Sequence, residues 1–128
     1  MHTIRLTELD AVILWCLPQP GCDLPYLVWM YTFCNRAAAP GYAELDGCLR
    51  RSIQIGALRY PETGHYQLTP EWYERVHQWD EQFKVPEDGM IEFSDWLPTQ
   101  EWPVVCPRVF ILTPEEYERA TAGRPRRG

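Results

Sequence analysis

The stretch 42–76 constrains the fold most, because each part of it carries a clear and different local signal. Small apolar residues recur at three- and four-residue spacing over 43–55, which predicts a helix with one narrow buried stripe. The stripe consists of Leu45, Cys48, Leu49 and Ser52. Gly56 follows at the position where a left-handed cap would end the helix. The sequence therefore predicts a helix that ends at residue 55.

Two short alternating runs come next, at 57–60 and 65–68. In each run, alternate residues are apolar, which is the period of a half-buried strand. The residues between them, 61–64, are Pro-Glu-Thr-Gly, and this composition favours a tight turn. Thr69 and Pro70 then begin another helix, with a hydroxyl at the cap position and proline in the first turn. We expect a helix, a two-stranded hairpin and a second helix.

This arrangement resembles the recognition helix, wing and post-wing helix of bacterial winged helix-turn-helix regulators, and a group of short uncharacterised bacterial winged-helix proteins. The pattern of that group has Tyr-x-Glu-Leu at the helix start, Gly and Leu after the helix, and Leu-Thr-Pro after the wing. The matching residues are Tyr42, Glu44, Leu45, Gly56, Leu58, Leu68, Thr69 and Pro70. The resemblance covers about the first two thirds of the chain, and it departs from the pattern at Ser52 and Ile53. It implies an α+β, mainly helical fold with a two-stranded wing.

Two helices are expected ahead of this stretch. Thr7 is a good cap for the first helix, which Pro18 should end. Asp23 is the expected cap of the second helix, which continues to about Asn35. Because the second helix is apolar nearly all round, we expect it to lie buried between other elements. Residues 1–83 would then form the winged-helix domain.

From Lys84 onward the chain is rich in proline, acids and tryptophan. The pattern predicts short strands at 90–93 and 104–112 and a last helix that begins at Thr113 and continues to about Ala122. Residues 84–122 would form a strand-and-helix extension packed on the domain. Residues 123–128 would be a disordered basic tail.

Composition argues against an enzyme, since neither serine lies in a Gly-x-Ser-x-Gly turn and no glycine-rich phosphate loop is present. The histidines and cysteines lack metal-ligand spacing, so no metal or cofactor is expected. Cys22 is more readily an ordinary loop cysteine than a reactive thiol. Five cysteines without a disulfide pattern favour a reduced cytoplasmic protein. The apolar runs are too short to cross a membrane.

The fold analogy suggests binding to double-stranded DNA. On that hypothesis Arg50, Arg51 and Gln54 contact DNA from the recognition helix, and Arg59 contacts it from the hairpin. The alternative interpretation of the three arginines is ordinary surface charge. Glu44 also opposes DNA, and so does the net charge of −6, because phosphate binding needs a local excess of cations.

The competing hypothesis is a protein-docking module on the same scaffold without DNA binding. Large side chains recur on one face of the post-wing helix, which indicates core packing against the first helix or a homodimer seam. These residues are Trp72, Val76, Trp79 and Phe83. Ile53 is expected at the surface, and the acidic segment 87–102 carries Trp96 and Trp102, which either anchor a partner or fold back onto the domain.

Overall fold

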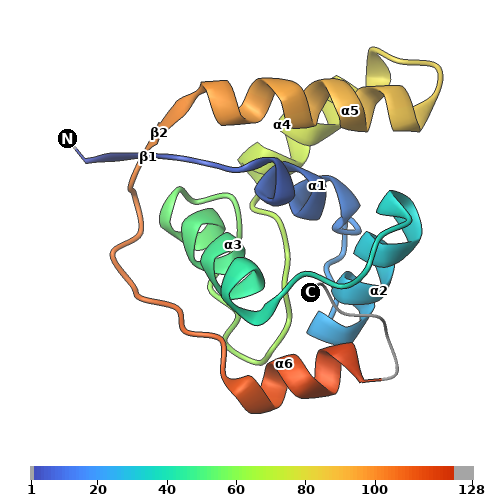
Figure 1. Cartoon of the computed structure of the whole chain (residues 1–128). Helices are drawn as coiled ribbons and strands as arrows, with labels where there is room; N and C mark the ends of the chain where they lie inside the picture. Colours follow the sequence, from blue (N-terminus) through green and yellow to red (C-terminus); the bar gives the residue numbers. More distant parts are fainter. Residues whose placement is uncertain (1, 123–128) are drawn as a thin grey trace.

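Residues 2–122 are described by the computed structural model, in which helices dominate and one small antiparallel sheet pairs the start of the chain with residues 101–103 (Figure 1). This is the mainly helical α+β class that the sequence predicts. In chain order the elements are β1 (Thr3–Arg5), α1 (Glu8–Cys16), α2 (Leu24–Asn35), α3 (Tyr42–Gln54), α4 (Pro70–Glu81), α5 (Pro86–Trp96), the 3-10 turn η1 (Leu97–Thr99), β2 (Glu101–Pro103) and α6 (Pro114–Thr121).

Side-chain caps set the starts of several helices. Thr7 caps α1 in a capping box with Asp10, and the Asp23 carboxylate accepts from the Tyr26 N–H at the start of α2. Thr69 behaves differently from its prediction. Its hydroxyl donates to the Gly56 carbonyl at 2.7 Å instead of capping α4, so it joins the start of α4 to the end of α3.

The two runs around the turn at 61–64 lie antiparallel, as predicted, but they pair over a short length. Leu58 and Leu68 form one bridge, and the Thr69 N–H donates to the Ala57 carbonyl at 2.9 Å. On the other side of the second run, Cys22 and Tyr66 exchange backbone hydrogen bonds of 2.9 and 2.7 Å. Three extended segments therefore lie side by side, and none is long enough to be a regular strand.

The regular sheet of the described chain pairs β1 with β2, with Thr3 opposite Pro103. This pairing was not expected, and the two strands predicted in the extension are wrong. Residues 90–93 belong to α5, where Pro86 stands in the first turn and Phe93 points into the core. Residues 104–112 belong to no strand. The Val104 N–H donates to the His2 carbonyl, whereas the Val105 and Cys106 N–H groups donate to the Gln54 carbonyl at the end of α3.

The core is centred on α1, in which Ala11, Ile13 and Leu14 are fully buried. Helix α5 packs across α1 and α4 on one side of the molecule, and α6 packs against α2 at the other end (Figure 1). Helix α2 is not buried all round, contrary to the prediction: Leu27 and Val28 face the core, but the opposite face is open to solvent. No helix among residues 2–122 is long and apolar enough to span a bilayer. The predicted tail at 123–128 lies outside the described residues.

Candidate interaction surfaces

Arg51, the first predicted DNA contact, forms an internal ion pair. Its guanidinium donates to both carboxylate oxygens of Asp10, from Nε at 2.8 Å and from Nη2 at 2.9 Å. Asp10 is fully buried, and its carboxylate also accepts from the Thr7 N–H at 2.8 Å. Hydrogen bonding to Asp10 raises the pKa of Arg51, so the guanidinium is held charged. Arg51 therefore fastens α3 to the start of α1.

Arg50 is also paired inside the chain. Its Nη2 forms an ion pair with Asp46 one turn earlier on α3, and its Nε donates to the Phe110 carbonyl at 3.1 Å. The charge of Arg50 is therefore neutralised by a carboxylate of its own helix. The two arginines predicted to meet phosphate thus meet carboxylates of their own chain.

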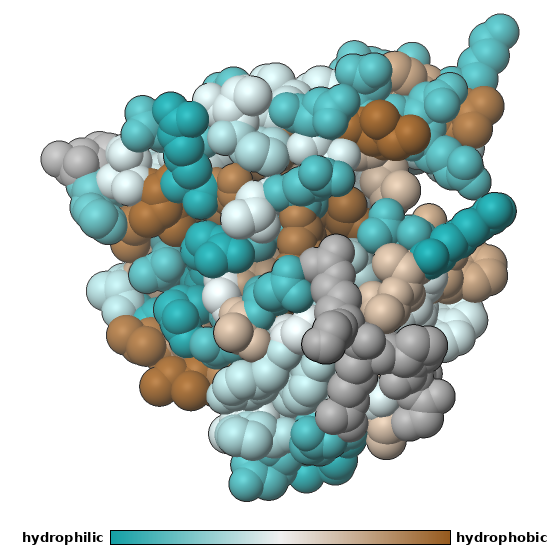
Figure 2. Space-filling view, in the orientation of Figure 1, coloured by the Kyte–Doolittle hydropathy of each residue, from teal (hydrophilic) through white to brown (hydrophobic). Residues whose placement is uncertain are grey.

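The extended segment 104–112, which we call the strap, runs along α3. At the end of the helix the Val105 and Cys106 N–H groups donate to the Gln54 carbonyl, at 2.8 and 3.1 Å. Near its start, the Leu112 N–H donates to the Asp46 carboxylate at 2.9 Å. The strap follows the left edge of the molecule in Figure 1, and hydrophobic residues are visible on that edge in Figure 2. Together these contacts cover one side of the predicted recognition helix.

The hairpin offers little positive charge. At its turn, Glu62 pairs with Arg108 of the strap at 2.6 Å, which lowers the pKa of Glu62, and the same guanidinium lies 3.5 Å from the centre of the Tyr60 ring. Arg59 is exposed, and among residues 2–122 it has no ion-pair partner. It is therefore the one predicted DNA contact whose charge is open to a ligand.

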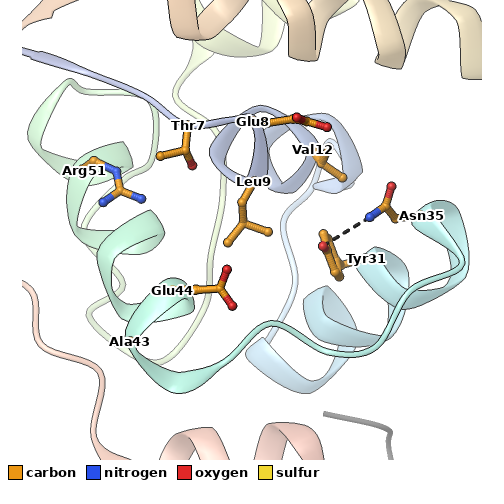
Figure 3. A pocket seen from close by; sticks show the side chains of 9 residues that line it. All are labelled: Thr7, Glu8, Leu9, Val12, Tyr31, Asn35, Ala43, Glu44 and Arg51. Carbon is orange, nitrogen blue, oxygen red and sulfur yellow. Dashed lines mark hydrogen bonds between the residues drawn. The ribbon is translucent and has the colours of Figure 1, made fainter. Parts of the chain in front are cut away.

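A hollow of about 540 Å³ lies between α1, α2 and the start of α3 (Figure 3). Leu9, Val12 and Tyr31 form its apolar wall. Its charged lining consists of Glu8, Glu44 and the Asp10-paired Arg51. The carboxylates of Glu8, at the start of α1, and Glu44, near the start of α3, repel phosphate, so this hollow does not favour a nucleic-acid backbone.

The predicted seam of α4 is largely covered by the chain itself. Trp72 is buried against Trp102, with ring centres 4.8 Å apart, and Trp79 contacts Trp96 at 5.2 Å. The ring contacts of the seam are therefore with α5 and β2, and its core packing is the first of the two predicted alternatives. The first helix, the predicted packing partner, is not among these ring contacts. Val76 on α4 and Phe83, two residues beyond the end of α4, are half-buried. A homodimer through these residues stays a prediction.

The tryptophans of segment 87–102 fold back onto the domain, which is the second of the two predicted alternatives. Trp96 and Trp102 contact each other, and the Arg75 guanidinium lies over the rings of both Trp72 and Trp102, at 4.8 Å from each ring centre. Such cation–π contacts join α4 to β2. Ile53, expected at the surface, is 1% exposed and belongs to the core.

A face missed by the sequence analysis lies on α2. Tyr26, Trp29 and Phe33 point to solvent, with exposures of 44%, 42% and 67%. Their rings form a ladder, with centres 5.8 Å apart between Tyr26 and Trp29 and 5.3 Å between Trp29 and Phe33. The spacing of three and four residues was present in the sequence, but apolar residues all round the helix hid it.

Beside this ladder is a hollow of about 280 Å³ between α2 and the start of α5. Phe33, Trp15 and Met90 provide its apolar walls, and Arg36 and Glu87 stand among its lining residues. An apolar hollow beside exposed aromatic rings is typical of a surface that receives a side chain from a partner.

Within the described chain, no cluster of metal ligands accompanies these surfaces. Among residues 2–122, no three His, Cys, Asp or Glu side chains gather closely enough to hold a metal ion. Cys22 is buried, and this burial, with a smaller contribution from Asp23, raises its pKa to about 11. At neutral pH its sulfur is therefore a thiol, which is a weak nucleophile.

Comparison with known proteins adds no family: no family model, curated protein or solved structure matches this chain.

Proposed function

We propose that the chain is a non-enzymatic protein-docking module on a winged-helix scaffold, and that its docking surface is the aromatic face of α2. The winged-helix assignment rests on chain order. Helices α1, α2 and α3 precede the short hairpin, α4 follows it, and the Cys22 segment between α1 and α2 pairs with the second arm of the hairpin at Tyr66.

The pairing of the arginines of α3 is the observation that favours docking over DNA binding. Arg50 and Arg51 are both neutralised by carboxylates, and Arg51 holds a buried one. Moving Arg51 to a phosphate would leave Asp10 buried without its partner, which costs several kcal/mol. Entry of α3 into a major groove would also require the strap to leave Gln54 and Asp46.

The charge distribution points the same way. The chain carries −6 overall, and residues 61–101 carry ten acids against Arg75 and Lys84. Counterion release needs several cations on one face, and Arg59 alone does not supply them. The aromatic face of α2 instead offers rigid rings on a helix without a charged residue from Leu24 to Asn35, which is the composition of an interface core.

Binding to duplex DNA tests the first half of the proposal. We expect no change in the fluorescence anisotropy of labelled duplex DNA at about 50 mM salt, where non-specific binders are retained. The matched variant is Arg59→Glu, which alters the open cation without touching an internal ion pair. Salt-dependent binding by the wild type that is lost in Arg59→Glu would favour the DNA hypothesis and overturn the docking function.

Site-specific photo-crosslinking tests the second half. A photoreactive amino acid in place of Phe33 should join the chain to a discrete protein, either another copy or a different one. The control position is Ile91, which is 53% exposed on α5. Equal crosslinking from both positions, or none from either, would contradict docking through α2.

A further inference from the structure

The exposed face of α2 is complementary to itself when two copies lie antiparallel. Resting on the docking function proposed above, we infer that its partner is a second copy of this chain, related by a two-fold axis that lies between the two α2 helices at the level of their midpoints. A two-fold interface uses the same patch on both molecules, so the patch must match its own reversed image.

The order of residues along α2 meets this condition. The midpoint between Trp29 and Met30 is also the midpoint between Tyr26 and Phe33. Antiparallel packing about that point therefore places Tyr26 of one copy over Phe33 of the other at each end, and brings the two Trp29 rings together at the centre. The ladder of rings, tilted between Tyr26 and Trp29 and stacked between Trp29 and Phe33, is already formed in the single chain, so little side-chain freedom is lost on association.

Charges at the two ends of the helix share the same midpoint. Asp23 caps the start of α2 and Arg36 follows its end, and both are exposed. Neither forms an ion pair within residues 2–122. In the antiparallel arrangement each Asp23 lies at the end of the interface that carries the partner's Arg36, whereas a parallel arrangement would bring like charges together.

The overall charge restricts the choice of face. Two copies with a net charge of −6 repel each other over most of their surfaces. Along α2 the residues Leu24–Asn35 are uncharged, and the helix dipoles of an antiparallel pair attract. The hollow beside Phe33, lined by Trp15 and Met90, gives the Tyr26 ring of the second copy an apolar place to enter.

Sedimentation velocity over a range of protein concentrations tests the inference. The wild type should pass from monomer to dimer as its concentration rises. Phe33→Glu should raise the dimer dissociation constant by about thirtyfold or more, because two buried carboxylates would enter the interface. Ile91→Glu adds the same charge to an equally exposed site on α5 and should leave the equilibrium unchanged. Circular dichroism of each variant checks that the fold is intact.

A charge exchange separates the antiparallel arrangement from any other. Asp23→Arg and Arg36→Asp should each dimerise about tenfold more weakly than the wild type, because like charges meet at both ends. An equimolar mixture of these two variants should recover dimerisation, since each then supplies the charge that the other lacks. Dimerisation that the mixture does not recover would overturn the antiparallel arrangement.

A wild type that stays monomeric throughout the concentration range would overturn the second copy as partner. The docking function itself would stand in that case if the photoreactive position 33 captured a different, discrete protein while position 91 did not. Salt-dependent DNA binding lost in Arg59→Glu would instead remove the docking function, so the two failures are distinguishable.

Discussion

Replacing Arg51 with alanine should destabilise the fold far more than replacing any arginine that only faces solvent. The reason is Asp10, whose carboxylate is fully buried and accepts two guanidinium hydrogen bonds of 2.8 and 2.9 Å. Without Arg51 the carboxylate keeps the Thr7 N–H but loses its counter-charge. Removing one partner of a buried ion pair costs about 3–5 kcal/mol.

The expected loss lies at the lower end of that range. The Arg51 side chain is 29% exposed and lines the hollow between α1, α2 and α3, so water can reach the space that it leaves. We therefore expect the free energy of unfolding to fall by about 3 kcal/mol in Arg51→Ala. Arg51→Lys should lose about half as much, because one ammonium group cannot form both bonds in the geometry of a guanidinium.

Urea unfolding followed by tryptophan fluorescence measures these differences, and Arg59→Ala is the matched control. Arg59 is exposed and unpaired within the described chain, so its replacement should change stability by less than about 0.5 kcal/mol. A double-mutant cycle with Asp10→Ala should give a coupling energy of about 2 kcal/mol. If Arg51→Ala and Arg59→Ala proved equally stable, the view that Arg51 is a structural residue would be wrong.

Three further changes test the packing of the α4 seam, the burial of Cys22 and the contact of the strap. Trp79→Ala should lower the free energy of unfolding by about 2 kcal/mol, because a half-buried ring loses its contacts with α5. Light scattering should give the variant the same molar mass as the wild type. Raising the pH from 9.0 to about 11 should lower the wild-type unfolding free energy by about 2 kcal/mol through Cys22. In this range the thiol ionises in the unfolded chain, whose pKa is near 9.0, but stays protonated in the folded chain, whose pKa is raised to about 11 by burial. In Cys22→Ala the pH profile should be flatter by that amount, and an unchanged profile would contradict the burial argument. Gly56→Ala and Gly64→Ala should each lower the unfolding free energy by about 1 kcal/mol, because alanine disfavours the left-handed backbone at both positions. Gly56→Ala should lose more than this, because its Cβ would lie 2.9 Å from Val105 Cγ2, whereas a Cβ at Gly64 meets no atom within 4 Å. Equal unfolding free energies for these two variants would show that the strap does not press on the end of α3.

Much of the local structure could be predicted from short-range signals. The starts of α1 and α2 follow from Thr7 and Asp23, and the end of α3 follows from Gly56, because a cap depends only on residues within one turn. The antiparallel runs on either side of 61–64 were predicted for the same reason. The strands expected at 90–93 and 104–112 failed, because an apolar run of that length is equally consistent with a helix or an unpaired extended segment.

Apart from α5, which was expected to contain a strand, the sequence by itself determined which segments become helices and where the chain turns, since these depend on neighbours a few residues apart. Only the tertiary structure decided what each helix face meets. Arg51 pairs with Asp10, which is forty-one residues away, and Arg50 donates a hydrogen bond to the strap. On α2, Tyr26, Trp29 and Phe33 are exposed, although the composition of the helix suggested burial on all sides. Helical periodicity marks a face as apolar or charged, but long-range packing sets what that face contacts. The sequence pattern alone could therefore not distinguish an internal ion pair from a DNA contact, or a core face from an interface.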